Sequence, residues 1–95
     1  MNHVELTACV VEVSPLRYTP AGIPAANLVL DHASDVLEDG AKRQVKLSIK
    51  AVAFGPMAEK VGKLPLGQAF RFSGFLISAR TNKSIIFHLQ DLNTL

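Results

Sequence analysis

The sequence predicts an all-β protein, a small barrel of five strands, and three observations lead to this prediction. The chain has 95 residues, of which 48% are hydrophobic, so it can enclose one modest core. Stretches rich in β-branched and aromatic residues recur along it and are separated by segments rich in proline and glycine. The one short helical segment, Met57–Val61, lies between the third and fourth predicted strands.

The first half of the chain contains two predicted strands. Val4–Val13 is expected to be the first, because it is rich in β-branched residues and alternates apolar with polar positions. Ser14–Pro24 contains three prolines and a glycine, which predicts a stiff loop that is neither a ladder strand nor a helix. Ala26–His32 is expected to be the second strand. Ala33–Ala41, with Asp39-Gly40, is expected to be a polar turn or mobile loop.

Lys42–Phe54 shows the clearest periodicity and predicts the third strand. Apolar and polar residues alternate with a period of two, which is typical of a half-buried strand, whereas a helix would scatter the lysines around its axis. The strand should therefore present a basic outer face. The predicted buried face consists of Val45, Leu47, Ile49, Ala51 and Ala53, and the outer face of Lys42, Gln44, Lys46, Ser48 and Lys50.

The second half of the chain completes the barrel. Pro56 suits the first position of the short helix. The last two strands are expected at Gln68–Ala79, with a bulge or bend at Gly74, and at Ser84–Leu92, joined by a polar hairpin loop, Arg80–Lys83. Five antiparallel strands with a helix between the third and fourth describe the OB-fold, a Greek-key barrel that commonly binds oligonucleotides or oligosaccharides.

An SH3-like barrel is the alternative fold. Its helical turn usually lies between the last two strands, where this sequence has only a short basic hairpin. The OB-fold is therefore preferred, and residues 1–95 are expected to form a single domain of this kind.

The net charge of +2 conceals an asymmetry between the two halves of the chain. Residues 1–40 carry a net charge of −5, and residues 41–95 carry +7. Such a split favours an anionic partner, nucleic acid first. The alternative is a solvated surface on which the fold intermixes the charges.

Catalysis, metal binding and cofactor binding are not expected. The sequence has no Ser/His/Asp arrangement, no phosphate-binding glycine loop and no paired carboxylates, and its histidines lack ligand spacing with Cys9. It also has no apolar run near about 20 residues and no segment resembling a signal peptide. With a single cysteine, a cytoplasmic location is expected.

The lysine row suggests how nucleic acid would bind. Lys42, Lys46 and Lys50 recur about 13 Å apart along a strand, so they can meet alternate phosphates of an extended single strand. Arg43 and Lys83 are expected to fill the intervals. The two loops that flank an OB-fold groove add further candidates, namely Arg17 and Tyr18 on the first and Arg80 and Lys83 on the last.

Aromatic residues are scarce, with no tryptophan, one tyrosine and five phenylalanines. Phe70 and Phe72 share a face that the core needs. Phe75 points the other way in a regular strand and is the candidate for stacking on a base. Binding is therefore expected to be largely electrostatic and weakly selective for sequence.

Several segments resemble the bacterial single-stranded-DNA-binding protein family. Ser14–Pro24 and Leu28–His32 resemble the first loop and second strand of that family. The short length and four later segments narrow the resemblance to its primosomal members, namely Arg43-Gln44, Val52–Gly55, Leu66-Gly67 and Phe72–Leu76.

The resemblance implies a homodimeric OB-fold protein that binds single-stranded DNA and helps the PriA helicase and other primosome proteins to restart replication. It places Met1–Val13 at the dimer contact, and Lys46 where family members can carry an aromatic residue. An adaptor whose basic face chiefly contacts a helicase is the alternative function. The residues that the resemblance places toward DNA are Lys42, Arg43, Lys46, Lys50, Arg80 and Lys83.

Overall fold

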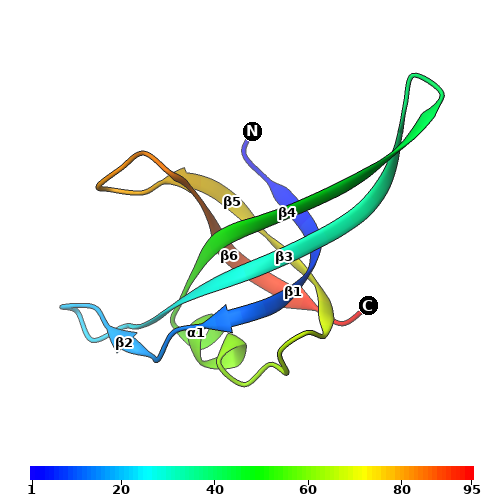
Figure 1. Ribbon diagram of the computed structural model, residues 1–95. Helices are drawn as coiled ribbons and strands as arrows, with labels where there is room; N and C mark the ends of the chain where they lie inside the picture. Colours follow the sequence, from blue (N-terminus) through cyan, green and yellow to red (C-terminus); the bar gives the residue numbers. More distant parts are fainter.

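The computed structural model describes residues 1–95 as a closed barrel of five strands with one helix and one very short extra strand (Figure 1). The sheet order is β1-β5-β6-β4-β3-β2, and β1 also pairs with β3, which closes the barrel. All pairings are antiparallel except that of β4 with β6. The elements are β1 (Val4–Val13), β2 (Arg17–Tyr18), β3 (Pro24–Glu38), β4 (Ala41–Phe54), α1 (Pro56–Val61), β5 (Ala69–Ser78) and β6 (Ile85–Asn93).

This architecture confirms the predicted OB-fold barrel. The helix lies between the third and fourth barrel strands, β4 and β5, rather than between the last two, so the SH3-like alternative is wrong. The helix begins at Pro56 after Gly55 and ends at Gly62, as the sequence predicts. It has six residues, and no helix of the protein is long and apolar enough to cross a membrane.

The prediction of a polar turn or mobile loop over Ala33–Ala41 is wrong. β3 continues to Glu38 and β4 begins at Ala41, and their residues pair without interruption up to the turn. Only Asp39 and Gly40 form the turn, with φ values of 52° and 77° that suit a two-residue hairpin of Asp-Gly type. Ladder hydrogen bonds satisfy the backbone of these polar strands, so Ala33–Lys46 forms a paired arm that projects beyond the barrel (Figure 1).

The predicted loop Ser14–Pro24 also contains a strand. β2 pairs with the beginning of β3, Arg17 opposite Ala25 and Tyr18 opposite Pro24. Pro24 is tolerated there because it is the first residue of its strand. β3 therefore begins at Pro24, two residues before Ala26, the residue at which the sequence predicts the second strand to begin.

The core lies inside the barrel and contains no buried polar or charged residue. Phe72 on β5 and Phe87 on β6 are its largest fully buried side chains, and Ala58 and Val61 of α1 close one end of the barrel. The apolar face of β4 is buried only at Ala51 and Ala53. Nearer the turn this face leaves the barrel with the arm, so the expectation of a buried face fails at Leu47, which is 39% exposed.

Gly74 lies at a bulge between β5 and β6, in agreement with the sequence-based expectation. The pairing steps from Ser73–Asp91 to Gly74–Leu89, which leaves β6 with one extra residue. A Cβ atom at position 74 would collide with the backbone carbonyl of His88 and crowd the ring of Phe87. The missing side chain therefore allows β6 to approach β5 closely, and it fixes the position of His88.

Candidate nucleic-acid interface

Alternate residues of β3 and β4 point away from the core and form the outer face of the sheet. Lys42, Lys46 and Lys50 lie on this face and are exposed, as the alternation in the sequence predicts. From Lys42 to Lys50 the row covers eight residue-to-residue steps, or about 26 Å at 3.3 Å per step. Phe54 follows Lys50 by four residues, so it lies on the same face, and it is 36% exposed.

Three rings continue the outer face from β4 across β6 to β5. Phe75 and His88 lie opposite each other in the ladder, with ring centroids 4.4 Å apart and ring planes within 19° of parallel. The ring centroid of Phe54 lies 5.2 Å from that of His88, at an interplanar angle of 36°. We call Phe54, His88 and Phe75 the platform, because they present partly exposed ring surface beside the lysine row.

Sequence reasoning selected only Phe75 from the platform. The outward position of Phe54 can also be predicted from the sequence, because its even-numbered position continues the alternation that places the lysines outward. His88 had no comparable signal. Its contact with both phenylalanines depends on the registers of β6 with β5 and with β4, in which it lies opposite Phe75 and Val52.

The structure divides the predicted basic residues of β4 into two groups. Lys42 Nζ lies 3.6 Å from Asp35 Oδ2, and Arg43 Nε lies 2.9 Å from Glu38 Oε1. Lys46 and Lys50 form no ion pair. The expectation that Arg43 fills an interval in the lysine row is wrong, because its odd-numbered position places it on the opposite face of the arm.

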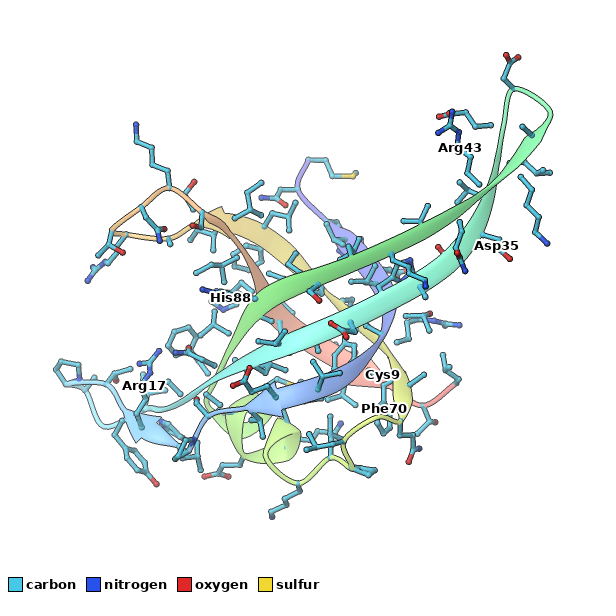
Figure 2. All side chains as sticks on the ribbon, in the orientation of Figure 1. Cys9, Arg17, Asp35, Arg43, Phe70 and His88 are labelled. Atoms are coloured by element: carbon cyan, nitrogen blue, oxygen red, sulfur yellow. The ribbon has the colours of Figure 1, made fainter.

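The two loops bring further predicted residues to the end of the barrel opposite the arm (Figure 1). Arg17 Nη2 donates a hydrogen bond to Asn27 Oδ1 at 3.2 Å, and the adjacent Tyr18 is 65% exposed. Arg80 and Lys83 are exposed on the hairpin loop between β5 and β6, so Lys83 does not lie within the lysine row. In Figure 2, Arg17 and Arg43 lie near opposite ends of the β3–β4 ribbon, and His88 lies between them.

A hollow of about 320 Å³ adjoins the lysine row. Its floor includes Val29, Val52 and Ile86, and its charged lining residues are Lys50 and Glu12. The apolar lining beside Lys50 suits a ligand with both a flat apolar part and an anionic part, and the carboxylate of Glu12 repels the anionic part toward the lysine side of the hollow. A nucleotide, with its base and its phosphate, has this combination.

The fold intermixes much of the charge that the sequence separates. Acidic residues lie on β3 and basic residues on β4, and the two strands are paired along the whole arm. Asp31 accepts a hydrogen bond from the hydroxyl of Ser48, while Asp35 and Glu38 form the two ion pairs with β4. The free positive charge of this ribbon is therefore concentrated at Lys46 and Lys50. No group of three or more His, Cys, Asp or Glu residues is placed to hold a metal ion.

Comparisons with known proteins identify the family to which the chain belongs. A family model described as "another single-strand binding protein family" matches residues 2–91. The chain is 45% identical over 92 residues to the replication restart protein PriB of Bordetella pertussis, an alignment that covers 96% of this chain and 86% of that protein. It is 42% identical over 92 residues to PriB of Neisseria gonorrhoeae, covering 97% and 90% of the two chains.

Two solved structures of proteins with related names are also similar to this chain. The structure of PriB from Ralstonia solanacearum superposes with a TM-score of 0.88 at 36% sequence identity, covering 99% of this chain and 97% of that one. A deletion mutant of the single-stranded DNA binding protein from Thermus aquaticus superposes with a TM-score of 0.77 at 22% identity. That match covers 100% of this chain and 50% of the other, and it concerns the fold alone.

Proposed function

Because this chain belongs to the single-strand binding protein family and, within it, to the PriB group, we propose that it binds single-stranded DNA during replication restart. The observation that carries the proposal is the position of two unpaired lysines and the platform on one face of the barrel. Lys46 and Lys50 contact phosphates, and the platform stacks on bases.

The two kinds of contact contribute differently to binding. Each phosphate contact releases counterions, and for single strands it adds about 0.7 to the slope of log affinity against log salt concentration. Stacking on an aromatic side chain contributes about 1–3 kcal/mol per base and depends little on base identity. Phosphate contacts thus supply most of the salt dependence. The platform gives a larger stacking contribution than a chain without tryptophan suggests.

The proposed partners are single-stranded DNA, the PriA helicase with other primosome proteins, and a second copy of this chain. The helicase is proposed from the family resemblance and from the PriB relatives. The second copy is supported by an open strand edge. β3 pairs with β1 only from Cys9 onward, so the segment Val4–Ala8 has β5 on one side and no strand on the other. The proposed location is the cytoplasm, where a bacterial chromosome is replicated.

The test is reversal of the two unpaired lysines. The variant Lys46→Glu/Lys50→Glu should bind a labelled 20-nucleotide oligo-dT at least about tenfold more weakly, with a salt slope lower by roughly 1.4, because two phosphate contacts are lost. Fluorescence anisotropy at two salt concentrations measures both quantities. Lys42 is left unchanged because it already forms an ion pair with Asp35.

The matched control is Lys60→Glu/Lys63→Glu, which makes the same change of charge on and just after α1, away from the outer face. It should bind within about twofold of the wild type, apart from a general charge effect. Equal losses in the two variants would remove the outer face as the binding surface. A chain that binds no DNA alone yet stimulates unwinding by PriA would instead support the adaptor function.

A further inference from the structure

The basic residues of β4 differ in whether a carboxylate of β3 forms an ion pair with them. The residue directly opposite is uncharged for Lys46, Lys50 and Lys42 alike, namely Ala33, Val29 and Leu37, and neither Lys46 nor Lys50 forms an ion pair. On the arm, Lys42 is paired with Asp35 on the outer face, and Arg43 is paired with Glu38 on the other face. The side chains of both ion pairs are more than half exposed, from 54% for Asp35 to 72% for Lys42. The arm therefore carries cations that a phosphate can reach but that carboxylates already occupy.

A carboxylate and a phosphodiester compete for the same cation. An arginine or lysine bound to one anionic oxygen gains little by exchanging it for another, and the displaced carboxylate is left close to the DNA backbone, which it repels. Exposed ion pairs are weak, so the exchange is possible but has a cost. The cost arises where DNA extends along the arm, because Lys46 and Lys50 form no ion pair, and Asp31, the carboxylate beside them on the outer face, accepts a hydrogen bond from Ser48 instead.

We propose that Asp35 and Glu38 act as internal substitutes for DNA phosphates: Asp35 withholds Lys42 and confines tight binding to the barrel half of the outer face, and Glu38 withholds Arg43 on the other face of the arm. The inference rests on the proposed DNA-binding function. It adds an explanation of what limits the length of single-stranded DNA that the protein binds. The acidic residues of β3 thus determine the footprint of the protein on DNA, while the lysines of β4 supply its affinity.

The test is to remove the two carboxylates with nearly isosteric amides, as Asp35→Asn/Glu38→Gln. Binding is measured to oligo-dT of about 6 nucleotides, near the lower end of the site sizes known for OB-folds, and of about 20 nucleotides, beyond their upper end of about 16. The control Asp39→Asn/Glu59→Gln removes the same two charges, and neither residue forms an ion pair. Asn suits position 39, whose φ is 52°.

The expected result is a gain of about two- to thirtyfold on the 20-mer, from release of two exposed ion pairs, with a steeper salt slope. On the 6-mer, the variant and the control should agree within twofold. A gain on the 20-mer less than twofold above that of the control overturns the inference. So does an equal gain on both oligonucleotides, because the effect would then be one of net charge alone.

Removal of the cations provides an independent check. Lys42→Gln/Arg43→Gln should weaken binding of the 20-mer by less than twofold in the wild-type background, but by more than threefold in the Asp35→Asn/Glu38→Gln background. Equal losses in the two backgrounds contradict the inference while leaving the proposed function intact. Failure of the wild-type chain to bind either oligonucleotide would instead overturn the proposed function, and the inference with it.

Discussion

Lys42 and Lys46 show how two identical side chains on one strand differ in availability. Both point outward and both are exposed, but only Lys42 forms an ion pair with a carboxylate of β3. The aromatic residues of β5 differ instead by the face on which they lie: Phe72 is fully buried, and Phe75 stacks on His88 at the surface. At the scale of the residue, function thus depends on the face of the strand and on the ion pairs formed there as much as on residue type.

The platform leads to a prediction for Phe54. The variant Phe54→Ala should bind oligo-dT roughly 5- to 150-fold more weakly, which corresponds to the loss of about 1–3 kcal/mol of stacking on one base. Its salt slope should be unchanged, because no phosphate contact is lost. Anisotropy titrations at two salt concentrations measure both effects, and Phe54→Tyr, which keeps the ring, is the control. Unchanged affinity in Phe54→Ala would exclude this ring from the DNA contact.

At the scale of the element, β5 depends on close approach to β6. The bulge at Gly74 brings the two strands together and holds the backbone of His88 where its ring meets Phe75. The glycine after α1 has a different role. Gly62 has right-handed helical dihedrals, φ −65° and ψ −17°, and a Cβ atom there would make only ordinary contacts.

These two glycines should respond in opposite ways to alanine. Gly74→Ala is expected to lower the free energy of unfolding by about 1–3 kcal/mol or more, since the added methyl group collides with the carbonyl of His88. Gly62→Ala should raise it by about 0.4–1 kcal/mol, because its conformation is compatible and the unfolded chain loses freedom. Urea denaturation followed by circular dichroism measures both. A stable Gly74→Ala protein would show that β6 can shift at the bulge.

At the scale of the whole molecule, one strand edge of the barrel remains open. The carbonyl of Thr7 accepts a hydrogen bond from His32 Nδ1 at 2.6 Å, which places this carbonyl on the side of β1 away from β5. In an antiparallel ladder, alternate residues direct both backbone groups to the same side. The backbone N–H of Glu5 therefore also faces the open edge, where a second copy of β1 is proposed to pair.

Proline at position 5 tests this pairing. Glu5→Pro removes a backbone N–H donor from the open edge but keeps the hydrogen bonds between β1 and β5. It should therefore shift the protein from dimer toward monomer. Glu5→Gln keeps the N–H and should sediment like the wild type. Sedimentation velocity at several concentrations distinguishes the two species. If Glu5→Pro remained as dimeric as Glu5→Gln, the contact between copies would lie elsewhere on the molecule.

The sequence is sufficient to predict that there are five barrel strands, where the helix lies and that β4 has a basic outer face, but not how far β3 and β4 extend into the arm. Each of these follows from local signals, namely alternation with a period of two and punctuation by proline and glycine. Only the tertiary structure decided which side chains meet. Phe54, Phe75 and His88 form one platform through the registers of β6 with β5 and with β4, which closure of the barrel sets. Asp35 and Glu38 reach Lys42 and Arg43 across a hairpin whose register the local Asp39-Gly40 turn sets. A one-residue slip of β6 would separate the three rings, and no local pattern in the sequence specifies the position of β6 beside β4.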